Sequence, residues 1–178
     1  VRDLEYGGEN TATVKVVYID TLSPAVTISG ESDGWTNTNQ TLTISASDTQ
    51  SGVGKKWYKI VKNTNEIPTK GLTELTGNTI TLSEEGRYYL YYKIYDNAGD
   101  TELDREANKT EGFKAVLIDK TAPAVSFGEY SASAGITVTA MDITSKLASL
   151  SYRIENGTEI PITLTNGQTD KVFTITDL

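Results

Sequence analysis

Two short phrases occur twice in this chain, and their spacing limits the fold more than any single residue does. Residues 46–53 (Ala-Ser-Asp-Thr-Gln-Ser-Gly-Val) recur 94 positions later as residues 140–147 (Ala-Met-Asp-Ile-Thr-Ser-Lys-Leu). Residues 19–26 (Ile-Asp-Thr-Leu-Ser-Pro-Ala-Val) recur 99 positions later as residues 118–125 (Ile-Asp-Lys-Thr-Ala-Pro-Ala-Val). Repetition at this period predicts tandem modules of about 90–100 residues each, a normal size for one small domain.

The register of the repeats predicts three segments. Residues 1–19 are expected to be the terminal strand of a preceding module, and residues 20–119 a complete module. Residues 120–178 are expected to be a second module that lacks its last strands. Two arrangements of that second module stay open. Its vacant sheet edge could accept the first strand of another molecule by strand exchange, or residues 171–178 could be its penultimate strand.

Alternation of apolar and polar residues predicts the fold class. It recurs in short runs, which are residues 41–46, 87–95, 114–118, 136–140 and 150–154. Glycine and asparagine turn signals separate these runs, and no stretch has the 3.6-residue period of a helix. We therefore expect an all-β chain built from antiparallel β-sandwiches. The proline at position 24 and its repeat at position 123 should make the module junctions short and stiff.

Composition excludes several classes of function. The chain has no cysteine and no histidine, so it lacks a thiol nucleophile, the commonest general base and the commonest transition-metal ligands. Its net charge of −8 disfavours binding to nucleic acid or to an anionic membrane. No apolar run reaches the roughly 20 residues of a membrane-spanning helix. With no catalytic motif present, we expect a protein that is not an enzyme.

Three phrases together resemble the bacterial immunoglobulin-like repeats of cell-surface and secreted proteins. They are residues 19–26, residues 46–53, and residues 86–99 (Gly-Arg-Tyr-Tyr-Leu-Tyr-Tyr-Lys-Ile-Tyr-Asp-Asn-Ala-Gly). The resemblance covers the first module fully and the second in part, and it departs at Lys146, where the family has glycine. The family implies tandem immunoglobulin-like sandwiches of Greek-key topology, an extracellular location, and neighbouring modules of the same chain as partners. At Lys146 we expect a differently shaped loop.

The resemblance implies a non-catalytic role as a structural spacer or adhesion module, which holds distal domains away from the cell in a semi-rigid array. Two alternatives are a carbohydrate-binding module and an accessory domain of a secreted glycoside hydrolase. Candidate ligand-binding residues for a glycan or a host protein are aromatic: Trp57, Tyr89, Tyr91, Tyr95 and Trp35. Exposed rings stack on sugars, but aromatic pairs on a solvent-facing sheet also simply stabilise it.

Aspartates beside the predicted loops are weak candidates for Ca²⁺ ligands, and no other cofactor is expected. They are Asp48, with its repeat Asp142, and Asp96 and Asp100. Calcium requires six to eight converging oxygens, and the chain offers no alternating run of aspartates. The alternative is that these side chains cap turns by accepting backbone N–H groups.

Lys114 is a further candidate for chemistry because it should share a strand face with Val116 and Ile118. In some Gram-positive surface modules, a buried lysine forms an amide with asparagine or aspartate. The alternative is a lysine whose stem packs on apolar surface while its amine reaches water.

Overall fold

The computed structural model describes residues 19–64, 66, 68, 70–98 and 108–176. In these residues every regular element is a β-strand, so the all-β prediction is confirmed. None of the described residues lies in a helix able to cross a membrane. The expected terminal strand of a preceding module, residues 1–19, lies outside the described residues except for Ile19.

Eight strands between Ala25 and Ile118 form two sheets. The first sheet has the order β1-β3-β6 and is antiparallel throughout. Its strands are β1 (Ala25–Ser29), β3 (Gln40–Ser47) and β6 (Thr79–Leu82). The second sheet has the order β2-β8-β7-β4-β5, and only the short β2 runs parallel to its neighbour β8. Its strands are β2 (Trp35–Thr36), β4 (Val53–Lys62), β5 (Thr73–Glu74), β7 (Gly86–Asp96) and β8 (Lys109–Ile118).

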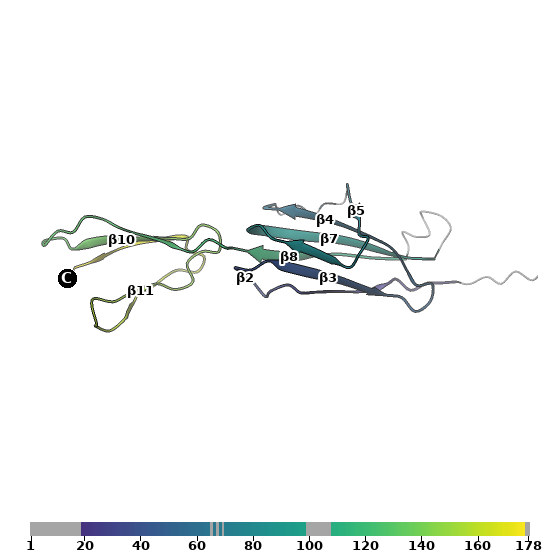
Figure 1. Cartoon of the computed structure of the whole chain (residues 1–178), viewed down its shortest axis with the longest axis horizontal. Coiled ribbons are helices and arrows are strands. Elements are labelled where there is room, and N and C mark those ends of the chain that lie inside the picture. The colour runs from purple at the N-terminus through teal and green to yellow at the C-terminus, as the bar shows by residue number, and fades with distance from the viewer. Residues whose placement is uncertain (1–18, 65, 67, 69, 99–107, 177–178) are drawn as a thin grey trace, which may run out of the picture.

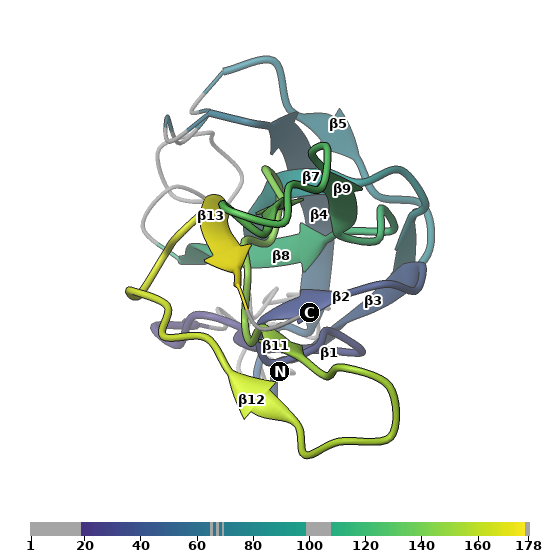
Figure 2. The same ribbon diagram turned by 90° about the vertical axis from the view of Figure 1, so that its left-hand side faces the viewer.

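The two sheets enclose one hydrophobic core. Period-two alternation sends Leu42 and Ile44 of β3 inward, and both are 0% exposed. The second sheet contributes Leu90 and Ile94 of β7 and Ile118 of β8 to the same cluster. In the end-on view of Figure 2, β1 and β3 lie on one side and β4, β7 and β8 on the other. The core thus fixes which face of each strand remains outside.

Five further strands follow, and Figure 1 shows them end to end with the first eight. We call β1–β8 the first lobe and β9–β13 the second lobe. The second lobe contains an antiparallel sheet of order β13-β10-β9 and a separate pair, β11 and β12. Its strands are β9 (Ala124–Phe127), β10 (Ile136–Met141), β11 (Ser151–Tyr152), β12 (Ile160–Pro161) and β13 (Asp170–Ile175).

Burial in the second lobe is uneven. Val138 and Ala140 of β10 are 3% and 1% exposed, which agrees with the alternation in residues 136–140. Their cross-strand neighbours Phe127 and Val125, on the same face of the sheet, are 66% and 52% exposed. Within the described residues, this apolar face is therefore only partly covered.

Candidate functional site

Two aspartates, Asp20 and Asp119, occupy the same place before the two lobes, and we call them the junction aspartates. Asp20 accepts hydrogen bonds from the backbone N–H groups of Leu22 and Ser51, both at 2.9 Å. Asp119 repeats the arrangement. It accepts from the N–H of Thr121 at 2.9 Å and from the N–H of Ser145 at 2.8 Å. Each junction aspartate therefore ties the start of its lobe to the loop within the other repeated phrase, residues 46–53 in the first lobe and 140–147 in the second.

The loops that the junction aspartates contact are held by a second repeated pair, Asp48 and Asp142. Asp48 Oδ1 accepts the backbone N–H groups of Gln50 and Gly52, each at 2.9 Å. Asp142 Oδ1 accepts three N–H groups in a row, those of residues 144–146, at 3.0–3.1 Å. Both side chains thus cap turns, which is a common role of aspartate beside serine and glycine.

Lys146 does not reshape its loop, contrary to the expectation from the sequence. Its φ angle is 78°, and the matching Gly52 has φ 81°. Both residues lie in the left-handed region, which costs a residue with a Cβ roughly 1–2 kcal/mol. The lysine therefore keeps the turn that glycine forms in the first lobe, at the expense of backbone strain.

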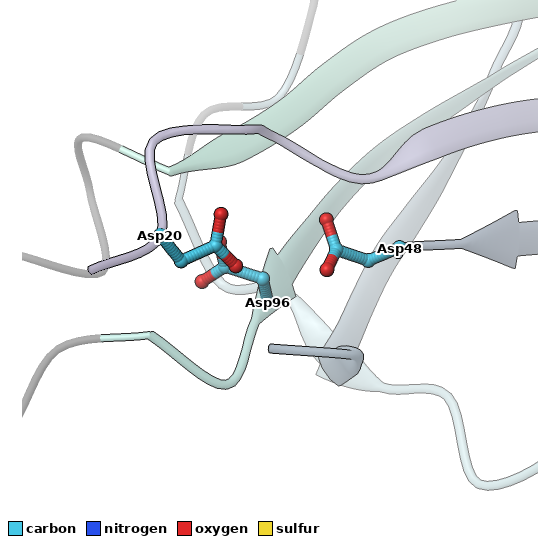
Figure 3. Close-up of side chains that lie close together, drawn as sticks. All are labelled: Asp20, Asp48 and Asp96. Atoms are coloured by element: carbon cyan, nitrogen blue, oxygen red, sulfur yellow. The ribbon is translucent and has the colours of Figure 1, made fainter. Parts of the chain in front are cut away.

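A third aspartate joins the pair in the first lobe. Asp20 precedes β1, Asp48 follows β3, and Asp96 is the last residue of β7. One carboxylate oxygen of each lies within 4.8 Å of the others, and the three side chains converge in Figure 3. We call this group the aspartate cluster. Asp100, the remaining candidate from the sequence, lies outside the described residues.

Asp96 is the most buried member of the cluster, at 2% exposed. Its Oδ1 accepts the backbone N–H of Ala98 at 2.9 Å. Its Oδ2 is fully buried and has no hydrogen-bond partner among the residues that the structure describes. A buried polar oxygen without a partner is costly, and most such atoms in folded proteins are satisfied.

Negative charge accumulates at the aspartate cluster. Hydrogen bonds from Ser51 and from the backbone N–H of Leu22 lower the pKa of the Asp20 carboxyl, outweighing the effect of burial. Among the described residues, no ion pair with lysine or arginine neutralises Asp20, Asp48 or Asp96. Three negatively charged carboxylates at one place suit the binding of a hard cation better than they suit acid–base catalysis.

The chain between the lobes is bound to the first lobe by successive residues. The backbone N–H of Asp119 donates to the Thr36 carbonyl at 2.8 Å. The N–H of Lys120 and the hydroxyl of Thr121 both donate to Glu85 Oε2, at 3.3 and 2.7 Å. The Lys120 ammonium also donates to Asn39 Oδ1 at 2.6 Å and to the Ser83 carbonyl. This junction is a fixed segment of chain rather than a free linker.

Trp35 lies at this junction. It belongs to β2, is half-buried, and lines a crevice together with Glu85 of the first lobe and Ile143 and Thr144 of the second. Because Trp35 is half-buried at this end of the first lobe, only part of its surface is open to a ligand.

The other candidate aromatic residues lie on the outer face of the larger sheet. Tyr89, Tyr91 and Tyr95 alternate along β7 with core residues, and the pairing of β4 with β7 places Trp57 opposite Lys93 on this face. Tyr91 is nevertheless only 7% exposed, and its hydroxyl donates to Glu111 Oε2 at 2.7 Å. That hydrogen bond is the main cause of the lowered pKa of Glu111.

Amines and rings alternate across this outer face. The Lys55 ammonium lies 5.7 Å from the Trp57 ring centroid, and the Lys93 ammonium 5.8 Å from that of Tyr95. The Tyr89 ring meets the Phe113 ring edge to face, with centroids 6.3 Å apart. Such contacts stabilise an exposed sheet by themselves. The rings of Trp57 and Tyr95 are thus each partnered by a lysine amine of their own strand.

Lys114 is held in an ion pair. Its Nζ lies 2.5 Å from Glu31 Oε1. The hydrogen bond from Lys114 lowers the pKa of Glu31, and the same contact raises the pKa of Lys114. The structure thus gives this amine a glutamate partner, not the asparagine or aspartate that an internal amide requires.

Asp20, the third member of the cluster, is not among the Ca²⁺ candidates predicted from the sequence, whereas Asp48 and Asp96 are. Its signal in the sequence is the repeated Ile-Asp phrase, which also marks the predicted module boundary. No family model, curated protein or solved structure matches the chain.

Proposed function

We propose that this chain is a non-catalytic spacer or adhesion segment of a bacterial cell-surface or secreted protein. Its modules would be immunoglobulin-like sandwiches that hold distal domains away from the cell in a semi-rigid array. The observation that carries the proposal is the hydrogen-bonded junction between the lobes, where Asp119, Lys120 and Thr121 each bind the first lobe.

Rigidity follows from the number and spacing of these bonds. A flexible linker has solvated backbone and few contacts, whereas here Glu85 alone accepts two hydrogen bonds from the junction. Pro123 then restricts the backbone just before β9. Asp119 adds a bond to the second lobe at Ser145. Bending at the junction would break several contacts at once, so the lobes should keep a preferred orientation.

The fold gives independent support. Two sheets around one core in the first lobe are compatible with a sandwich, and the repeated phrases fit the proposed tandem array. The carbohydrate-binding alternative has weaker support, because Tyr91 is buried and the Trp57 ring lies beside an ammonium group.

Distances between spin labels in the two lobes would test the proposal. The chain has no cysteine, so Ser45→Cys and Thr174→Cys, both at exposed strand positions, would place one label in each lobe. We expect a narrow distance distribution that broadens on Glu85→Ala. The matched control is Glu84→Ala, which removes only the ion pair with Lys62. A broad distribution in the otherwise unchanged chain would contradict the proposed rigidity.

A further inference from the structure

We propose that the aspartate cluster, Asp20, Asp48 and Asp96, binds one calcium ion at the start of the first lobe. This site goes beyond the spacer function and does not depend on it. The cluster draws one carboxylate from each of three separate chain segments to within 4.8 Å of one another.

The first argument is charge. Like charges at this separation repel, and each raises the free energy of ionising its neighbours. No lysine or arginine in the described part of the chain pairs with the cluster. A cation bound between the three carboxylates would be attracted by each of them and would offset their mutual repulsion.

The second argument is the unsatisfied oxygen. Within the described part of the chain, no donor reaches Asp96 Oδ2, which is buried in a side chain that is 2% exposed. The carboxylate lies beside that of Asp20 in Figure 3. A metal ion between the carboxylates would give this oxygen the partner that the described residues do not supply.

The geometry also orients the ligands. Backbone N–H groups hold one oxygen of Asp96 and one of Asp48, and they fix the Asp20 carboxylate from two sides. A carboxylate held this way needs little reordering when an ion binds, which reduces the entropic cost of binding. Water would complete the six to eight oxygen ligands that calcium takes.

The donor set selects the type of ion. All three ligands are carboxylate oxygens, which suit hard cations, and the chain has no histidine or cysteine for a softer metal. Magnesium is usually held by one or two carboxylates and keeps most of its water. Three converging carboxylates therefore favour calcium.

The second lobe provides an internal comparison. Asp119 and Asp142 repeat the positions and backbone contacts of Asp20 and Asp48. Among the described residues, no third acidic side chain joins them to form a comparable cluster. Turn capping is thus common to both lobes, and the third carboxylate, Asp96, distinguishes the first.

Calorimetric titration of the full chain with CaCl2 after EDTA treatment would test the site, together with thermal unfolding. Extracellular calcium modules bind with Kd of about 10⁻⁴–10⁻³ M, so the titration should reach about 10 mM. We expect one ion per chain and a rise in Tm of about 5–15 °C at that concentration. Asp96→Asn should abolish both effects, and in EDTA it should unfold at a higher temperature than the unchanged chain.

Two further variants keep the test decisive. Asp48→Asn retains a turn-capping oxygen and should also lose calcium binding, which covers the case that Asp96→Asn fails to fold. Asp142→Asn should keep the full calcium response. Absence of heat and of a Tm change at about 10 mM CaCl2 would overturn the proposal. So would an equal response in Asp96→Asn, or an equal response of the unchanged chain to MgCl2.

Discussion

Replacing Asp119 by alanine should lower the free energy of unfolding by about 2–4 kcal/mol, which is the sum of the losses of two hydrogen bonds. The side chain is 7% exposed and accepts two backbone N–H groups. Ser145 is half-buried, and without Asp119 its N–H keeps only the longer hydrogen bond to Asp142 Oδ1, at 3.1 Å. Losing the 2.8 Å hydrogen bond to a charged acceptor costs about 1.5–3 kcal/mol. The Thr121 N–H is exposed, so water replaces its partner and the cost is about 0.5–1 kcal/mol.

Asparagine should have a smaller effect because it keeps one acceptor oxygen. We expect Asp119→Asn to cost about 1–2 kcal/mol, since one of the two hydrogen bonds to the side chain is lost. Asp20→Asn removes the same kind of contact but also removes a charge facing Asp48 and Asp96. Without calcium, its cost should therefore be below that of Asp119→Asn.

Urea denaturation in EDTA, followed by circular dichroism, would give the free energy of unfolding for all three variants. Amide hydrogen exchange would follow the Ser145 N–H directly, and its protection should fall in both Asp119 variants. The reasoning would be refuted if Asp119→Ala changed stability by less than about 0.5 kcal/mol, the usual range for surface substitutions. Unchanged protection at Ser145 would refute it as well.

Three other outcomes are expected. Leu90→Ala, at a core position that is 0% exposed, should lower the free energy of unfolding by about 3–4 kcal/mol in urea titrations; a loss below 1 kcal/mol would contradict the core assignment. Lys146→Gly should raise Tm, because it relieves roughly 1 kcal/mol of strain at φ 78°; a lower Tm would argue against strain. The lowered pKa of Glu31 means that its ion pair with Lys114 stabilises the fold above the ordinary value of 4.5, and this contribution is lost as pH falls through the lowered pKa. Glu31→Gln should remove that part of the acid dependence of stability, and an unchanged pH profile would count against it.

Local pattern predicted the fold class because strand faces repeat every two residues. Alternation placed Leu42 and Leu90 in the core, and both are fully buried. The same pattern failed at residues 150–154, where the structure has only the two-residue β11. Glu155 adopts a φ of 47°, so the chain turns immediately after this run. A backbone angle of that kind leaves no trace in apolar periodicity.

The candidate site was less accessible to sequence reasoning, because it depends on which segments meet. Asp48 and Asp96 each lie beside a predicted turn, but their proximity to Asp20 follows from the pairing of whole strands. Burial of Tyr91 is a similar case. Period two predicts its face, whereas its burial depends on the neighbouring strand that carries Glu111 and Phe113.

The way the chain enters and leaves the first lobe has a mechanical consequence. The segment before β1 is attached to the start of β8, since the Asn108 amide donates to the Asp20 carbonyl at 2.8 Å and Thr110 donates to the Pro24 carbonyl. Strand β8 then runs along the long axis to the far end of the lobe (Figure 1). A pull on the two chain ends would drag β1 and β8 past each other lengthwise. The ten residue pairs of β7 with β8 would then be loaded in shear and would have to yield together, not one after another.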